Sequence, residues 1–68
     1  MANNAEAIKA FTSKTAVTIA TLDAIKSHVE DHMGVGPDRI NWAHVGSIGH
    51  VLELLQQASE FLGLPEVA

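Results

Sequence analysis

The sequence predicts an all-α protein in which two helices form an antiparallel hairpin, and two hairpins pair into a four-helix bundle. Three observations predict this fold. Apolar residues recur at three- and four-residue steps, the spacing of one helical face, along most of the chain. A single glycine-rich segment, GVGPDRI, interrupts that pattern. The chain has only 68 residues and no cysteine, so a stable core is expected to need a partner.

The first helix is expected over about residues 4–33. Its seam alternates steps of three and four and consists of Ile8, Phe11, Thr15, Thr18, Leu22, Ile25, Val29 and His32. The stretch TAVTIATL also alternates like a strand, but the helical period continues through it without a turn signal, so we reject the strand. Threonine has low intrinsic helicity, so this helix is expected to depend on packing. Gly34 is expected to end it.

Residues 34–40 are expected to connect the two helices. Gly34 and Gly36 permit positive φ, and Pro37 with Asp38 favours a turn. A single helical turn at Pro37–Ile40 fits this composition.

The second helix is expected over about residues 42–62. Asn41 is a suitable N-cap, Gly63 a suitable residue after the C-cap, and Pro65 prevents continuation. We expect the tail after Gly63 to be frayed. The apolar face is broad and comprises Val45, Ile48, Val51, Leu52, Leu54, Leu55, Ala58, Phe61 and Leu62. A lone hairpin would leave part of this face wet, so residues 1–68 are expected to form one hairpin domain that homodimerises.

Composition argues against several classes of partner. The net charge is −4, and the four basic residues, Lys9, Lys14, Lys26 and Arg39, are scattered, which is unlike a nucleic-acid binder or a protein of anionic membrane surfaces. The N-terminal residues lack the features of a secretory signal, and no apolar run is long enough to span a membrane. With no cysteine present, we expect a cytoplasmic protein.

No arrangement typical of catalysis stands out. His44, near a helix N-terminus, and Ser47 have no partner at diagnostic spacing. Gly34-x-Gly36 lacks the preceding strand, the third glycine and the lysine of a phosphate loop. We therefore expect no enzymatic activity and no cofactor.

The histidines offer an alternative interpretation. His28 and His32 are four residues apart, which puts two imidazoles on one face of a helix, and His44 or His50 can complete a divalent-metal site. No compact triad of ligands is set by the spacing, so no metal site is expected. A histidine-based metal or small-ligand binder remains the second hypothesis.

The pair Gly46 and Gly49 is unusual inside a helix, where each glycine costs up to about 1 kcal/mol relative to alanine. Together with Trp42, His50 and Glu53 they are predicted to form a partner-binding surface, which we call the Trp42 notch. The notch is expected either to pack within the dimer or to receive another protein. The leading hypothesis is thus a non-enzymatic helical protein that acts through homodimerisation and protein–protein interaction.

Overall fold

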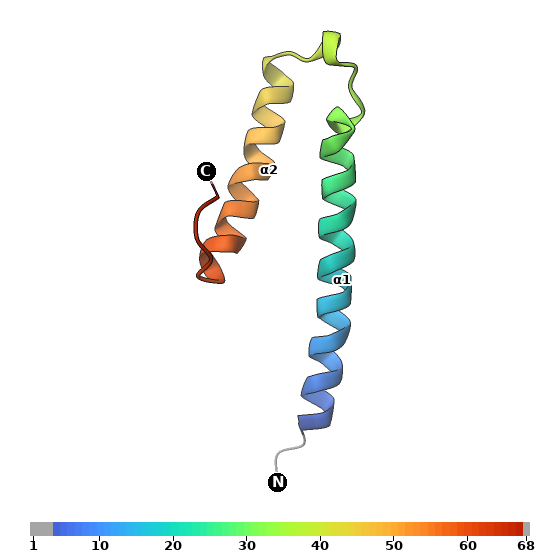
Figure 1. Cartoon of the computed structure of the whole chain (residues 1–68), viewed down its shortest axis with the longest axis vertical. Coiled ribbons are helices and arrows are strands. Elements are labelled where there is room, and N and C mark those ends of the chain that lie inside the picture. Colours follow the sequence, from blue (N-terminus) through green and yellow to red (C-terminus); the bar gives the residue numbers. More distant parts are fainter. Residues whose placement is uncertain (1–3, 68) are drawn as a thin grey trace. The chain divides into compact units, whose positions relative to one another are not determined.

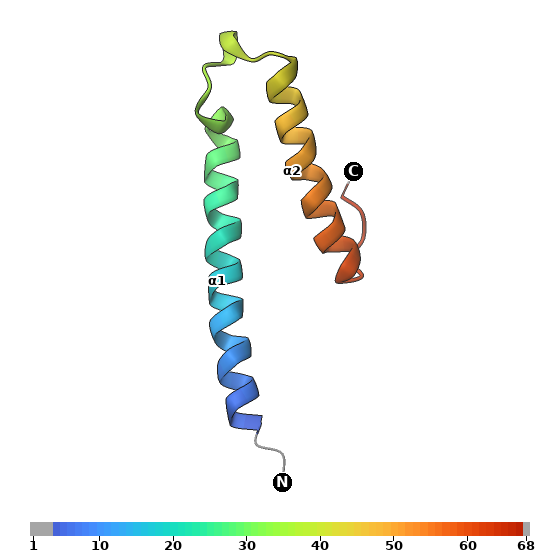
Figure 2. The ribbon, with the colours of Figure 1, turned by 180° about the vertical axis from the view of Figure 1, so that it is seen from behind.

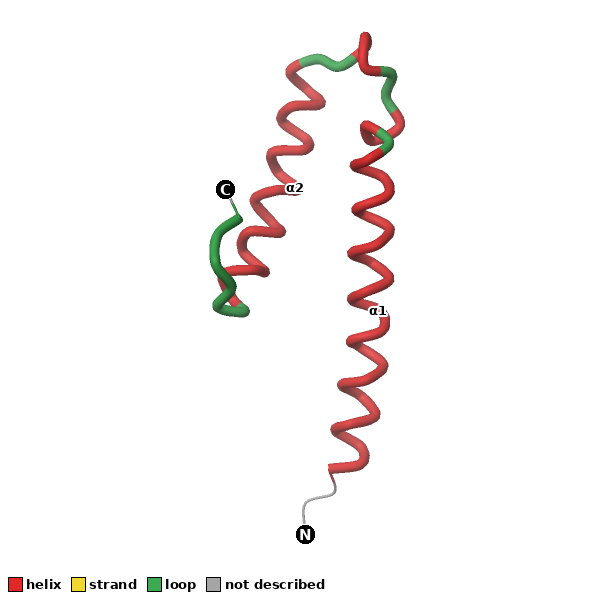
Figure 3. The backbone as a smooth tube through the Cα atoms, in the orientation of Figure 1, coloured by secondary structure: helices red, strands yellow, loops and turns green. Residues whose placement is uncertain are grey.

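The structure is a computed structural model that describes residues 4–67. Within that range the chain forms two α-helices, α1 (Asn4–Glu30) and α2 (Trp42–Phe61), separated by two short turns, η1 (His32–Gly34) and η2 (Pro37–Arg39), with no strand (Figures 1 and 3). The all-α class is therefore confirmed. The chain divides into two units, Met1–Val35 and Gly36–Ala68.

Helix α1 passes without a break through the threonine-rich stretch that also reads as a strand. Two threonines keep their hydroxyls satisfied within the helix: Thr18 Oγ1 donates to the Lys14 carbonyl at 2.7 Å, and Thr21 Oγ1 donates to the Val17 carbonyl at 2.8 Å. Such bonds to the preceding turn let β-branched polar residues lie on a helix surface. No residue of α1 is buried, and Ile25 is the one that is half-buried.

The end of α1 differs from the prediction. The helix ends at Glu30, three residues before the expected end at residue 33. The first residue with positive φ is His32 (55°), followed by Met33 (55°) and Gly34 (78°), so Gly34 is the third such residue rather than the first. The turn is closed by the Gly34 and Val35 amides, which donate to the Asp31 and His32 carbonyls at 3.0 Å each.

This left-handed corner carries strain. An L-residue in the left-handed region costs roughly 1–2 kcal/mol, because its Cβ crowds the following carbonyl. Two successive non-glycine residues, His32 and Met33, hold that conformation here. Sequence reasoning placed the helix end at the glycine because glycine alone avoids this cost.

Helix α2 begins at Trp42 with Asn41 as its N-cap, as predicted, but the cap contains an unusual partner. Asn41 Oδ1 accepts from the backbone amides of Ala43 at 2.9 Å and His44 at 3.4 Å. In return the Asn41 amide donates to His44 Nδ1 at 3.0 Å, which completes a capping box. The third helical position of a capping box ordinarily holds Glu or Gln. Here a neutral imidazole nitrogen accepts the bond instead.

The C-terminal end of α2 is closed by its own backbone. Leu64 N–H donates to the Ser59 carbonyl and Gly63 N–H to the Glu60 carbonyl, both at 3.0 Å, with Gly63 at φ 72°. These two bonds form a Schellman motif. The chain then turns back alongside the last turns of α2 (Figures 1 and 2). The expected frayed tail is therefore hydrogen-bonded at its start.

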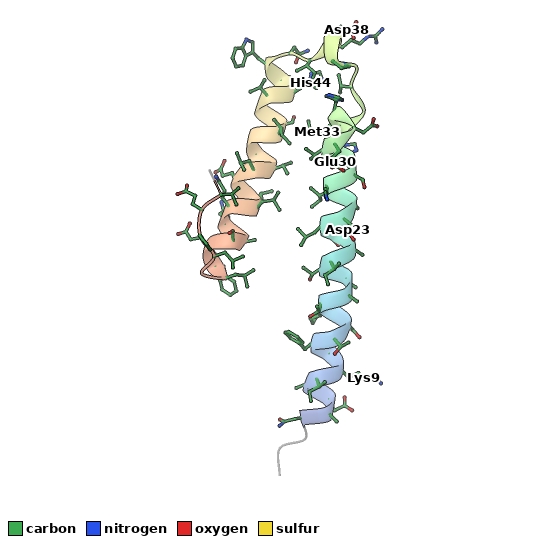
Figure 4. All side chains as sticks on the ribbon, viewed as in Figure 1. Lys9, Asp23, Glu30, Met33, Asp38 and His44 are labelled. Atoms are coloured by element: carbon green, nitrogen blue, oxygen red, sulfur yellow. The ribbon has the colours of Figure 1, made fainter. Side chains whose placement is uncertain are left out.

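No side chain is buried within residues 4–67. In α2 the least exposed side chains form one helical row: His44, Ile48, Val51, Leu55 and Ser59. Many large apolar side chains stand in solvent on both helices (Figure 4), among them Phe11, which is 72% exposed, and Phe61, which is 90% exposed. Neither described helix combines the length and hydropathy needed to cross a bilayer.

Candidate functional site

The Trp42 notch lies on the first three turns of α2. Trp42 is the first residue of the helix, directly after its cap, and its side chain is 85% exposed. His50 and Glu53 are also exposed. At about 100° per residue the five residues of the notch occupy an arc of about 100°, so they share one face of α2.

The two glycines of the notch have open space beside them. A Cβ atom built on Gly46 or on Gly49 would meet no heavy atom within 4 Å, apart from the backbone of the helix itself. Within residues 36–67, nothing occupies the space beside these two glycines.

The notch is separate from the least exposed row of α2. Its arc is centred roughly opposite Val51 and Leu55, which belong to that row. Further along the helix the notch face continues with polar residues, Gln57 and Glu60. The notch is therefore an aromatic ring and a glycine gap at one end of a mainly polar face.

The four histidines are divided between the two units, with His28 and His32 in the first and His44 and His50 in the second. His28 lies in α1, but His32 lies beyond the end of α1 in the left-handed corner, so the two do not share a helical face as expected. His44 uses Nδ1 in the capping box. In the part of the chain that the structure describes, no three His, Cys, Asp or Glu side chains come close enough together to hold a metal ion.

A second feature was missed by sequence reasoning. The returning tail and the C-terminal half of α2 enclose a groove of about 660 Å³, which we call the C-terminal groove. Its apolar lining is Leu52, Leu55, Leu64 and Val67, and the carboxylates Glu60 and Glu66 also line it. Gly63 and Pro65 signalled the end of α2 in the sequence, but not the direction that the tail takes after it.

Comparison with protein-family models, with curated proteins and with solved structures finds no match to this chain. The chemistry that these two surfaces offer is recognition. The notch supplies one exposed aromatic ring beside open backbone, and the groove supplies an apolar trough edged by carboxylates. Such features suit contact with another helix or peptide.

Proposed function

We propose that this chain is a non-enzymatic helical protein of the cytoplasm that works by self-association and by binding another protein. In the proposed assembly each chain folds as an antiparallel helical hairpin, and two hairpins pair as a homodimeric four-helix bundle. The observation that carries the proposal is the lack of any buried side chain within residues 4–67.

The breadth of the apolar face of α2 supports two helical neighbours rather than one. Around α2 the apolar side chains cover an arc of about 200°, about twice the stripe that a surface helix turns to its core. The least exposed row lies along the middle of this arc, while Leu52 on one flank and Leu54 on the other remain about half exposed. If one neighbouring helix covers the middle of the apolar arc, a helix from a second chain would cover an edge that is still exposed to water.

In such a bundle the Trp42 notch faces outward, because it lies on the opposite side of α2 from the least exposed row. We propose that it receives a basic helix or peptide. Glu53 lies on this face, and residues 36–68 carry four carboxylates against the single Arg39, so a positively charged partner is favoured electrostatically.

The mass of the particle in solution tests self-association. Light scattering at micromolar concentration should report twice the chain mass, together with a mostly helical circular dichroism spectrum. A folded particle with the mass of one chain would refute the homodimer.

The sign of one substitution tests whether the notch faces outward. Gly49→Ala in an open notch should raise stability by about 0.4–1 kcal/mol, because alanine favours the helix and restricts the unfolded chain. If a second chain fills the notch, the added methyl must displace it and stability should fall by about 1 kcal/mol or more. Chemical denaturation of the dimer separates the two cases, and a loss of stability would refute the outward-facing notch.

Binding at the notch has its own measurement. A synthetic basic amphipathic helix should change the fluorescence of Trp42, the single tryptophan of the chain, in a saturable manner. Gly49→Leu, which fills the gap, should abolish the change. An acidic peptide of the same length is the control, and equal responses to both peptides would argue against the proposed partner.

A further inference from the structure

The C-terminal groove combines an apolar trough with negative charge. Leu52 and Leu55 come from α2, and Leu64 and Val67 come from the tail that runs back beside it. Each side of the groove contributes one carboxylate: Glu60 comes from α2 and Glu66 from the tail. At about 660 Å³ the groove is several times larger than one aliphatic side chain, so it can take the apolar face of about one helical turn.

The N-terminal part of α1 has the complementary chemistry. Residues 7–22 contain two lysines and no carboxylate, in a chain whose net charge is −4. Ile8 and Phe11 form an apolar pair on one face and are 62% and 72% exposed. At about 100° per residue, Lys14 lies to one side of this pair and Lys9 to the other, and Lys9 projects from the helix in Figure 4.

We propose that the C-terminal groove receives the segment Ile8–Lys14 from a second copy of the chain. The Ile8 and Phe11 side chains enter the leucine-lined trough, and the two lysines pair with Glu60 and Glu66. Two such contacts, related by the two-fold axis, would tie the ends of the bundle together. This inference rests on the self-association proposed above and adds which segments of the two chains contact each other.

Charge reversal on the two sides of the contact provides the test. Lys9→Glu with Lys14→Glu makes the segment negative, and Glu60→Lys with Glu66→Lys makes the groove positive. In each homodimer both contacts then become repulsive, so the dimer dissociation constant should rise at least about tenfold at low salt. All of these side chains are exposed, so both variants should keep their helicity.

Mixing the two variants identifies the occupant. In a heterodimer both contacts are attractive again, so an equimolar mixture should associate as tightly as the wild type, with heterodimer as the main species in native mass spectrometry. If the contact forms within one chain, mixing the two variants should not restore tight association. Only a chain that carries all four substitutions would then regain the wild-type dissociation constant, and this result would overturn the second copy as occupant of the groove. Salt at about 1 M should remove the difference among all variants by screening.

One control excludes a general effect of net charge. Lys26→Glu alters the remaining lysine of α1, outside the proposed segment, and should change the dissociation constant by less than about twofold. If Lys26→Glu raised the dissociation constant as much as the other variants, or if no charge reversal changed it, the proposed contact would be wrong. The dimer itself would still stand. A wild-type chain that is monomeric at low salt would refute the proposed function itself.

Discussion

His44 sets a condition on the start of α2 that a glutamate or glutamine in its place would not. Its Nδ1 accepts the Asn41 amide at 3.0 Å, and this nitrogen has a lone pair to offer only while the ring is neutral.

His44→Ala removes this acceptor and should lower the stability of α2 by about 0.5–1.5 kcal/mol, because the Asn41 amide loses its partner. His44→Gln keeps an acceptor at the third helical position and should cost less. Far-UV circular dichroism in a denaturant series measures both, with His50→Ala as the matched control. Equal midpoints for His44→Ala and the wild type would show that this bond does not stabilise the cap.

Gly63 illustrates how one dihedral angle decides the effect of a methyl group. A Cβ at Gly63 would meet no heavy atom within 4 Å, but the residue has φ 72°. Gly63→Ala should therefore destabilise α2 by about 1–2 kcal/mol through backbone strain alone. Gly63→Asn should cost less, because asparagine tolerates the left-handed region. Denaturant midpoints compare the two, and equal values would mean that the tail leaves the Schellman geometry in solution.

At the scale of the element, the early end of α1 places His32 outside the helix that carries His28. His28 lies on the helix and His32 in the left-handed corner, so the pair has lost its four-residue helical spacing. Calorimetric titration with Zn²⁺ is expected to give no affinity tighter than micromolar, and a chelator should leave the melting temperature unchanged. Submicromolar binding that disappears in His32→Ala would restore the second hypothesis.

The helices themselves were predictable because their signals are local. The spacing of apolar residues, the Asn41 cap and the Gly63 stop each act within a turn or two, and each is present in the structure. The end of α1 was not predictable, because His32 and Met33 adopt a conformation that their own propensities oppose. The C-terminal groove was missed for a different reason: it needs the direction of the tail after Gly63, which composition does not give.

The candidate site was predictable only in part. The Trp42 notch follows from residue spacing on one helix, and the structure adds that the space beside Gly46 and Gly49 is open. Helical periodicity carries no information about what fills that space. The same holds for the broad apolar face, whose width indicates more than one neighbour without naming them.

For the whole molecule, Leu52 is the position at which a substitution tests the proposed dimer interface most directly. It is 54% exposed in the single chain and also lines the C-terminal groove. Leu52→Asp should abolish dimerisation and folding together, since an unpaired charge would enter the proposed interface, at a cost of about 4 kcal/mol or more.

Gln57→Asp is the matched control for Leu52→Asp, because it adds the same charge on the polar face of the same helix and should leave the dimer intact. Sedimentation and circular dichroism at matched concentrations compare them. A folded dimer in Leu52→Asp would place the interface elsewhere.

The absence of buried side chains from α1 has a consequence for how its backbone exchanges protons. A helix of 27 residues without a covered face is held mainly by its internal hydrogen bonds, and these open readily in water. Amide exchange in the middle of α1 should therefore slow as chains associate and quicken on dilution. Deuterium uptake measured at two concentrations would then locate, residue by residue, where one chain shields another.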